Sequence, residues 1–127
     1  DGRALFACGS PFDPVRLAGH EHVPRQGNNS YIFPGVGLAA ISVRAQRITD
    51  AMFLAAARAL AQQVTPQDLA QGSLYPPLAQ VREVSAHIAA AVAAVAFDEG
   101  HAGIARPADL LAHVKSCMYE PSYPSYA

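Results

Sequence analysis

Two adjacent asparagines, Asn28 and Asn29, are the residues of this 127-residue sequence whose type and position best suit ligand binding. Each amide side chain offers two N–H donors and one acceptor oxygen without carrying a charge. Gly27 precedes them, and a glycine permits a tight backbone conformation or the close approach of a ligand. An apolar, helix-length segment follows, so we expect both amides where a helix begins, a place that favours an anion.

Capping alone would also explain this cluster of polar residues. Asparagine and serine are ordinary N-cap residues, and Ser30 directly follows the two asparagines. Judged by composition alone, capping is the favoured interpretation. The ligand-binding interpretation therefore needs support from the rest of the chain.

A second candidate loop follows the apolar run Ala4–Ala7, which is typical of a short buried strand. Cys8, Gly9 and Ser10 come next, and Pro11 favours a turn. In a nucleotide-binding sheet such a loop lies at the carboxyl edge, where ligands bind. Gly9 and Ser10 are therefore candidate cofactor contacts, although the residues alone indicate only a turn.

A small hairpin is predicted over residues 13–24, turning near Ala18-Gly19. His20 and His22 would share one side of its second strand, as in half of a metal site. No further ligand cluster is placed to complete such a site, so surface histidines are the favoured interpretation. A small metal protein would instead bind Zn²⁺ or Ni²⁺ stoichiometrically. Arg25 follows the hairpin and is a weak candidate for contact with an acidic ligand.

Hydrophobic spacing and capping residues predict helices over most of the remaining chain. The first covers residues 29–45, and its regular part begins near Pro34 because proline suits a first turn. Thr49 is the expected N-cap of a second helix over residues 50–63. The expected apolar stripe of that second helix consists of Met52, Phe53, Ala56, Leu60 and Val64.

Three further segments complete the chain. Thr65 is predicted to cap a short helical turn that Gly72 ends. A long helix is expected over residues 78–97 and a shorter one over residues 108–118. The tail, residues 119–127, alternates tyrosine with proline, which suits either docking on another surface or a frayed terminus. The expected buried face of the long helix consists of Val81, Val84, Ile88, Val92 and Val95.

Composition limits the class of protein. With 127 residues, 51% hydrophobic and 15% charged, the chain suits a single globular unit. The net charge is −1 and the basic residues are scattered, so neither a nucleic-acid partner nor a membrane surface is expected. We also expect no membrane span and no signal peptide. Cys8 and Cys117 are expected to be free thiols, and the arginine-rich, alanine-rich composition suggests a bacterial source.

The residues that would carry out catalysis are not evident in this sequence. It has no Gly-x-Gly-x-x-Gly turn, and its ten carboxylates are dispersed rather than grouped for Mg²⁺ or Mn²⁺. Its one lysine, Lys115, and the carboxylate of Glu83 are both expected at the surface. No catalytic residue is therefore assigned within these 127 residues.

Several runs of sequence, taken together, resemble the malic enzymes. They occur in the order found in that family and cover nearly the whole chain. One departure is Cys8, where the family more often has serine or threonine. The matching runs are Ala4–Phe12, Gln26–Leu38, Arg47–Asp50 with Met52–Ala57, Gly72–Leu78 and Arg82–Ser85.

The resemblance implies a fold. We expect a mainly α chain with a short strand and a small β-hairpin at its N-terminal end, forming the C-terminal portion of an α/β Rossmann-like NAD-binding domain. Residues 1–127 would be one unit, with strand, loop and hairpin over 1–27 and helices and tail over 28–127. Because the sequence opens with Asp1 rather than methionine, we expect a piece of a longer chain.

The resemblance also implies a function. The parent enzyme would oxidatively decarboxylate (S)-malate to pyruvate and CO₂ with NAD or NADP and Mg²⁺ or Mn²⁺. Asn28 and Asn29 would contact malate, with the catalytic tyrosine, lysine, metal ligands and dinucleotide turn supplied from outside this segment. By itself the segment would be inactive and would bind no cofactor tightly.

The expected partners are malate, the remainder of the malic enzyme chain and further copies in a cytoplasmic dimer or tetramer. The alternative hypothesis is a stand-alone, non-catalytic helical interaction module. The upstream reading frame would separate the two hypotheses.

Overall fold

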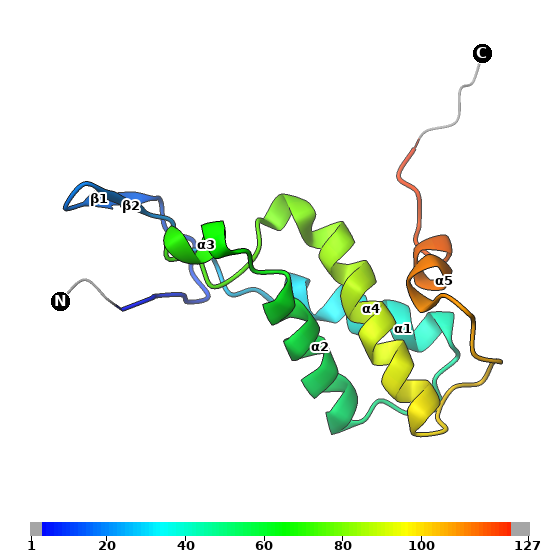
Figure 1. The fold of residues 1–127 in the computed structure, drawn as a ribbon. Coiled ribbons are helices and arrows are strands. Elements are labelled where there is room, and N and C mark those ends of the chain that lie inside the picture. Colours follow the sequence, from blue (N-terminus) through cyan, green and yellow to red (C-terminus); the bar gives the residue numbers. More distant parts are fainter. Residues whose placement is uncertain (1–3, 123–127) are drawn as a thin grey trace, which may run out of the picture.

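The structure is a computed structural model that describes residues 4–122. A thin N-terminal arm joins a bundle of helices, and α5 lies at the opposite end from the arm (Figure 1). The elements in chain order are β1 (Val15–Leu17), β2 (His20–His22), a 3-10 turn (Asn29–Tyr31), α1 (Phe33–Ser42), α2 (Asp50–Gln62), α3 (Pro66–Ala70), a second 3-10 turn (Leu78–Gln80), α4 (Val81–Asp98) and α5 (Leu110–Ser116).

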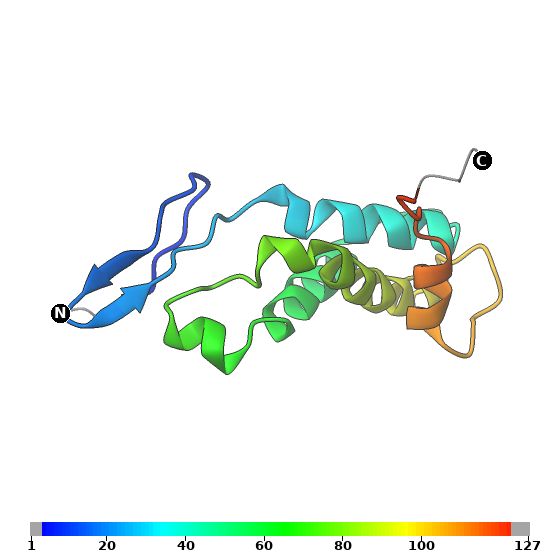
Figure 2. The ribbon, with the colours of Figure 1, turned by 90° about the horizontal axis from the view of Figure 1, so that it is seen from above.

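Helix α4 is the centre of the bundle, because α1, α2 and α5 all pack against it. The view from above shows these helices gathered at one end and the hairpin extending from the other (Figure 2). The predicted face of α4 is confirmed at Val84, Ile88 and Val92, which are 2% exposed or less. The other core residues include Tyr31, Val36, Ala39, Val43, Met52, Ala56, Ala89, Ala93, Ala96 and Val114.

The predicted first helix consists of two elements. The 3-10 turn covers Asn29–Tyr31, and the regular helix begins at Phe33 with Pro34 in its first turn, as expected. Helix α1 ends at Ser42 rather than Ala45, because Arg44 adopts a left-handed conformation with φ 51°. A single residue with positive φ ends the helical hydrogen-bond pattern.

Helix α2 begins at its predicted cap, where Thr49 Oγ1 accepts a hydrogen bond from the Met52 N–H. The predicted stripe is correct for Met52, Ala56 and Leu60 but wrong for Phe53, which is 51% exposed. Phe53 directly follows Met52 on the helix, so it lies about 100° further round the helix axis and turns away from α4.

The other predicted helices differ from the observed ones mainly at their ends. Thr65 and Asp68 form a capping box at the start of α3, and Gly72 ends it with φ 74°. The long helix begins with a 3-10 turn and becomes regular only at Val81. Helix α5 begins later than predicted, because the Asp109 side chain caps it by accepting from the Ala112 N–H.

The predicted hairpin is confirmed, whereas the predicted buried strand is not. Strands β1 and β2 pair in antiparallel register across a turn at Ala18 and Gly19, with φ 51° and 80°. Residues 4–7 are irregular, and Leu5 and Phe6 are 49% and 56% exposed. A strand needs a neighbour to satisfy its backbone groups, and the part of the chain that the structure describes places no strand beside this segment.

By length and composition alone, residues Leu78–Asp98 are apolar enough to cross a membrane, with a mean hydropathy of 1.2. Core helices satisfy the same criterion, and α4 has three other helices packed on it. The predicted docking role of the tail falls largely on residues 123–127, which lie outside the described residues.

Candidate functional site

A cavity of about 600 Å³ lies where the N-terminal arm meets the helices, and the Asn28–Asn29 turn forms part of its wall. The cavity brings together three predicted site residues, Gly9, Asn28 and Asn29, whereas Ser10 does not line it. Its other lining residues come from the arm, the start of α1, α2 and the segment before α4; they are Ala7, Cys8, Gly27, Ile32, Ala57, Leu60, Ala61, Leu74 and Tyr75.

The two asparagines have different surroundings. Asn28 is the N-cap of the 3-10 turn, and its Oδ1 accepts a hydrogen bond of 2.9 Å from the Ser30 N–H. Asn29 is exposed, and the structure gives its amide no hydrogen-bond partner among residues 4–122. Capping therefore occupies the Asn28 oxygen, whereas neither the oxygen nor the nitrogen of the Asn29 amide has a partner among residues 4–122.

Hydrogen bonds to the loop at Cys8 and Gly9 hold the start of the asparagine turn. The Gly27 N–H donates to the Cys8 carbonyl at 2.8 Å, and Gln26 Nε2 donates to the Gly9 carbonyl, also at 2.8 Å. These two bonds bring the two predicted loops side by side, although about 17 residues of sequence separate them.

The segment between α3 and α4 holds the arm just after β2. The Val23 N–H donates to the Gln71 carbonyl at 2.8 Å, and Ser73 Oγ donates back to the Val23 carbonyl at 2.6 Å. Ser73 is completely buried. The arm is therefore fixed to the helical part before it reaches the asparagines.

Arg25 has an internal role rather than the ligand contact considered from the sequence. Its guanidinium pairs with the Asp68 carboxylate at 2.7 Å and also donates to the Tyr75 carbonyl. The backbone N–H and then the hydroxyl of Thr65, followed by Arg25, lower the pKa of Asp68 below its ordinary value. Both contacts are made by Nη1, and they join the loop to α3 and to the segment before α4.

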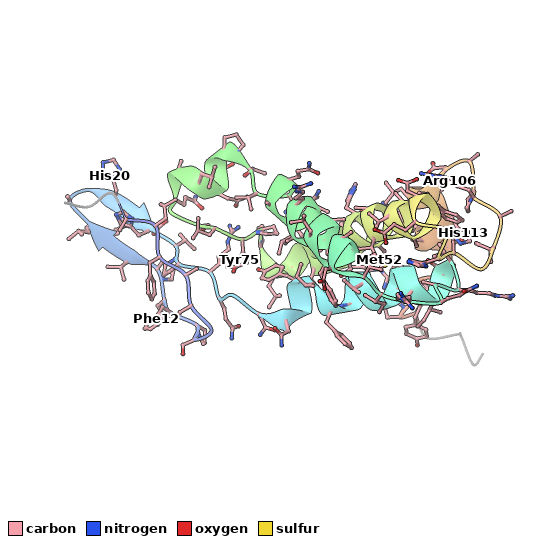
Figure 3. The ribbon with its side chains drawn as sticks, turned by 90° about the horizontal axis from the view of Figure 1, so that it is seen from below. Phe12, His20, Met52, Tyr75, Arg106 and His113 are labelled. Carbon is pink, nitrogen blue, oxygen red and sulfur yellow. The ribbon has the colours of Figure 1, made fainter. Side chains whose placement is uncertain are left out.

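Two tyrosines stack beside the cavity. The rings of Tyr31 and Tyr75 are nearly parallel, at an interplanar angle of 13° with centroids 5.2 Å apart. Tyr31 is buried and donates its hydroxyl proton to the Pro76 carbonyl at 2.6 Å. Burial, the largest cause, raises the pKa of Tyr31, so the hydroxyl remains a donor at neutral pH. Tyr75 instead lines the cavity, at the junction of arm and bundle (Figure 3).

The chemistry of the cavity wall is that of a neutral binding surface. No Asp, Glu, Lys, Arg or His lines the cavity among residues 4–122. Amides and backbone groups can hydrogen-bond a carboxylate or hydroxyl, and a hydrogen bond to a charged group contributes about 1.5–3 kcal/mol. The wall can therefore orient a polar ligand, but it holds no acid–base pair that would work at neutral pH.

The described residues also do not fit a metal or a dinucleotide pyrophosphate. Within residues 4–122 no group of three His, Cys, Asp or Glu side chains is placed to bind a metal ion. His20 and His22 lie on strand β2, where His20 is exposed on the hairpin (Figure 3) and His22 is half-buried near Gly72. A pyrophosphate is usually held by a glycine turn that opens a helix, whereas Gly9 and Ser10 form a bend that leads into β1.

Lys115 and Glu83 lie at the surface as expected and form an ion pair of 2.7 Å. This pair joins α5 to α4 and lies outside the cavity lining. Tyr75 and the α2 residues Ala57, Leu60 and Ala61 were not assigned to the site from the sequence. Tyr75 and Ala57 belong to runs that resemble the malic enzymes, and Leu60 was expected in the apolar stripe of the second helix, but no sequence signal pointed to Ala61.

Comparison with known proteins identifies strong similarity over nearly the whole chain. The family described as "Malic enzyme, NAD binding domain" matches residues 1–97. The chain is 53% identical to an "NADP-dependent malic enzyme" of Phaseolus vulgaris and 51% identical to that of Vitis vinifera, over 98% of its own length. It is 50% identical to an "NADP-dependent malic enzyme, chloroplastic" of Oryza sativa subsp. japonica, also over 98% of its length. The chain spans about a fifth of the length of these curated relatives, 20–21% of each.

Proposed function

The chain belongs to the malic enzyme family, and we propose that it forms a malate-contacting wall of an enzyme that converts malate to pyruvate and CO₂ with NAD or NADP. The observation that carries this proposal is the uncharged cavity wall, in which the amides of Asn28 and Asn29 lie among mostly apolar residues and the turn that bears them is hydrogen-bonded to the loop at Cys8 and Gly9. The relatives are named as NADP-dependent malic enzymes, which supports NADP as the dinucleotide.

Asn29 is the residue that we assign to the ligand. Its amide is exposed at the cavity and has no partner among the described residues, whereas the Asn28 oxygen caps the following turn. A neutral amide can bind a malate carboxylate or hydroxyl without changing the charge of the site. Asn28 contributes by holding the turn in which Asn29 lies.

Charge balance, proton transfer and hydride transfer must then come from other parts of the enzyme. A divalent metal, when bound, would polarise the oxygen on C2 of malate, and a dinucleotide would accept the hydride from that carbon. Within this wall Asn29 orients malate and the apolar side chains of Ile32 and Leu60 exclude water. We propose that the 127-residue polypeptide by itself does not decarboxylate malate.

The remainder of the enzyme is the partner that this arrangement requires. Phe33 and Phe53 are 76% and 51% exposed and line a second, apolar hollow of about 310 Å³ that Asn29 and Ile32 also line. An exposed apolar surface next to a binding site is typical of an interface. We propose that further parts of the enzyme, including neighbouring subunits, pack around this region.

The name of the rice relative favours a plastid over the expected cytoplasm, and the plant relatives lend no support to a bacterial source.

Steady-state kinetics of the full-length enzyme test the assignment. Asn29→Ala should raise the malate KM or lower kcat/KM roughly 10- to 100-fold, as expected for loss of one hydrogen bond to a charged group. The KM for the dinucleotide should change little. Leu69→Ala, on the surface of α3 and outside the cavity lining, is the control. Unchanged malate kinetics in Asn29→Ala would remove the assignment. Malate turnover by the 127-residue polypeptide would overturn the proposal that the catalytic groups come from other parts of the enzyme.

A further inference from the structure

We propose that Tyr75 is a positioning residue whose ring fixes the Asn28–Asn29 turn by packing on the backbone of Gly27. This inference rests on the proposed contact between Asn29 and malate. Tyr75 contributes no step of the reaction itself. It sets the place from which the amide reaches the ligand.

The space above Gly27 is filled by the Tyr75 ring. A Cβ atom added at Gly27 would lie 3.1 Å from the Tyr75 hydroxyl oxygen and 3.4 Å from ring atoms Cε2 and Cζ. The φ angle of Gly27 is not in the left-handed region, which the structure records for Gly19, Gly72 and Gly100. The glycine is therefore required by the close approach of a side chain rather than by backbone conformation.

The Tyr75 ring has little freedom to move away. One face stacks on Tyr31, which is itself buried and held by its hydrogen bond to Pro76. The Tyr75 carbonyl accepts a hydrogen bond from Arg25, and the ion pair with Asp68 holds Arg25 in place. A displaced ring would lose part of this stacking and packing.

Gly27 transmits this constraint to the asparagines because it is held on two sides. Its side-chain position faces Tyr75, and its N–H donates to the Cys8 carbonyl at 2.8 Å. Asn28 and Asn29 follow directly, so a shift of Gly27 also shifts the turn that carries their amides. A small displacement of a ligand-positioning group is costly, since about 1 Å can change a rate 100-fold.

A double-mutant cycle in the full-length enzyme tests the contact. Gly27→Ala should raise the malate KM about tenfold, with the dinucleotide KM unchanged, because the added methyl group displaces the turn. Tyr75→Phe retains the ring and its stacking on Tyr31, so by itself it should raise the malate KM less than Gly27→Ala does. The double variant should recover at least half of the loss on a logarithmic scale, because the Tyr75 hydroxyl is the closest atom to the added methyl group. Leu69→Ala, exposed on α3 and outside the cavity lining, is again the control.

Three results would overturn the proposal: an unchanged malate KM in Gly27→Ala, a double variant no better than Gly27→Ala, or equal losses for malate and dinucleotide. Asn29→Ala separates this failure from that of the proposed function. If Asn29→Ala impairs malate use and Gly27→Ala does not, only the positioning role fails. If Asn29→Ala has no effect, thermal unfolding of the same four proteins tests the contact. Adding Tyr75→Phe to Gly27→Ala should restore the melting temperature that Gly27→Ala lowers. Absence of that recovery counts against the contact.

Discussion

The guanidinium of Arg25 lies 2.7 Å from the Asp68 carboxylate, and their side chains are only 17% and 9% exposed. This ion pair joins the loop that precedes the asparagines to the first turn of α3. The Asp68 carboxylate also accepts from the N–H and hydroxyl of Thr65, at 2.9 and 2.7 Å. One carboxylate therefore both begins a helix and anchors the candidate site.

Asp68→Asn should destabilise the 127-residue chain by about 2–4 kcal/mol at pH 7, because it leaves Arg25 without its partner. The folded pKa of Asp68 is lowered from 3.8, so the carboxylate stabilises the fold fully above that value. This stabilisation is lost as the pH falls through the folded pKa. Urea unfolding of both proteins at pH 7 and near pH 3 should show the difference shrinking in acid. A difference independent of pH would contradict the assignment.

Asn28→Ala and Asn29→Ala should affect stability differently although the residues are adjacent. Loss of the Asn28 cap should cost about 1 kcal/mol. Asn29→Ala should stay within about 0.5 kcal/mol, as for a surface residue without a partner. Chemical unfolding of the two variants measures both values. Equal destabilisation would mean that the two amides do not have separate roles.

Gly35→Ala should destabilise the bundle, whereas Gly37→Ala on the same helix should not. A Cβ at Gly35 would lie 2.6 Å from Ile88 Cγ2 and 3.0 Å from the Ser85 carbonyl, where α1 meets α4. Overpacking of this kind costs about 1–3 kcal/mol. Gly37 has open space, so alanine should stabilise α1 by up to about 1 kcal/mol. Thermal unfolding should give melting temperatures shifted in opposite directions.

The 127-residue chain by itself should self-associate through the exposed apolar surface of α1 and α2. Phe33 and Ile41 on α1 are 76% and 79% exposed, and Phe53 and Leu54 on α2 are 51% and 52% exposed. Phe33→Ser should shift light scattering at high concentration toward the monomer. Leu17→Ser, on the equally exposed hairpin, is the control. A parent chain that stays monomeric at high concentration would remove this prediction.

The sequence predicted the features that depend on neighbours along the chain. Thr49 and Thr65 cap the helices expected of them, Gly72 ends α3, and the hairpin turns at Ala18-Gly19. These outcomes follow because a cap or a turn is formed by residues within four positions of each other. The spacing of valine and isoleucine likewise identified the buried face of α4, since that face repeats every 3.6 residues.

The tertiary structure decided everything that depends on partners far away in the sequence. The run at residues 4–7 looked like a buried strand, yet no described strand pairs with it. Arg25 looked free to bind a ligand until Asp68, 43 positions later, provided its partner. Gly27 is set beneath the Tyr75 ring only once the α3–α4 segment folds back on the arm. The local sequence pattern specifies which side chains could bind a ligand. Long-range packing decides which of them already have hydrogen-bond or ion-pair partners within the protein.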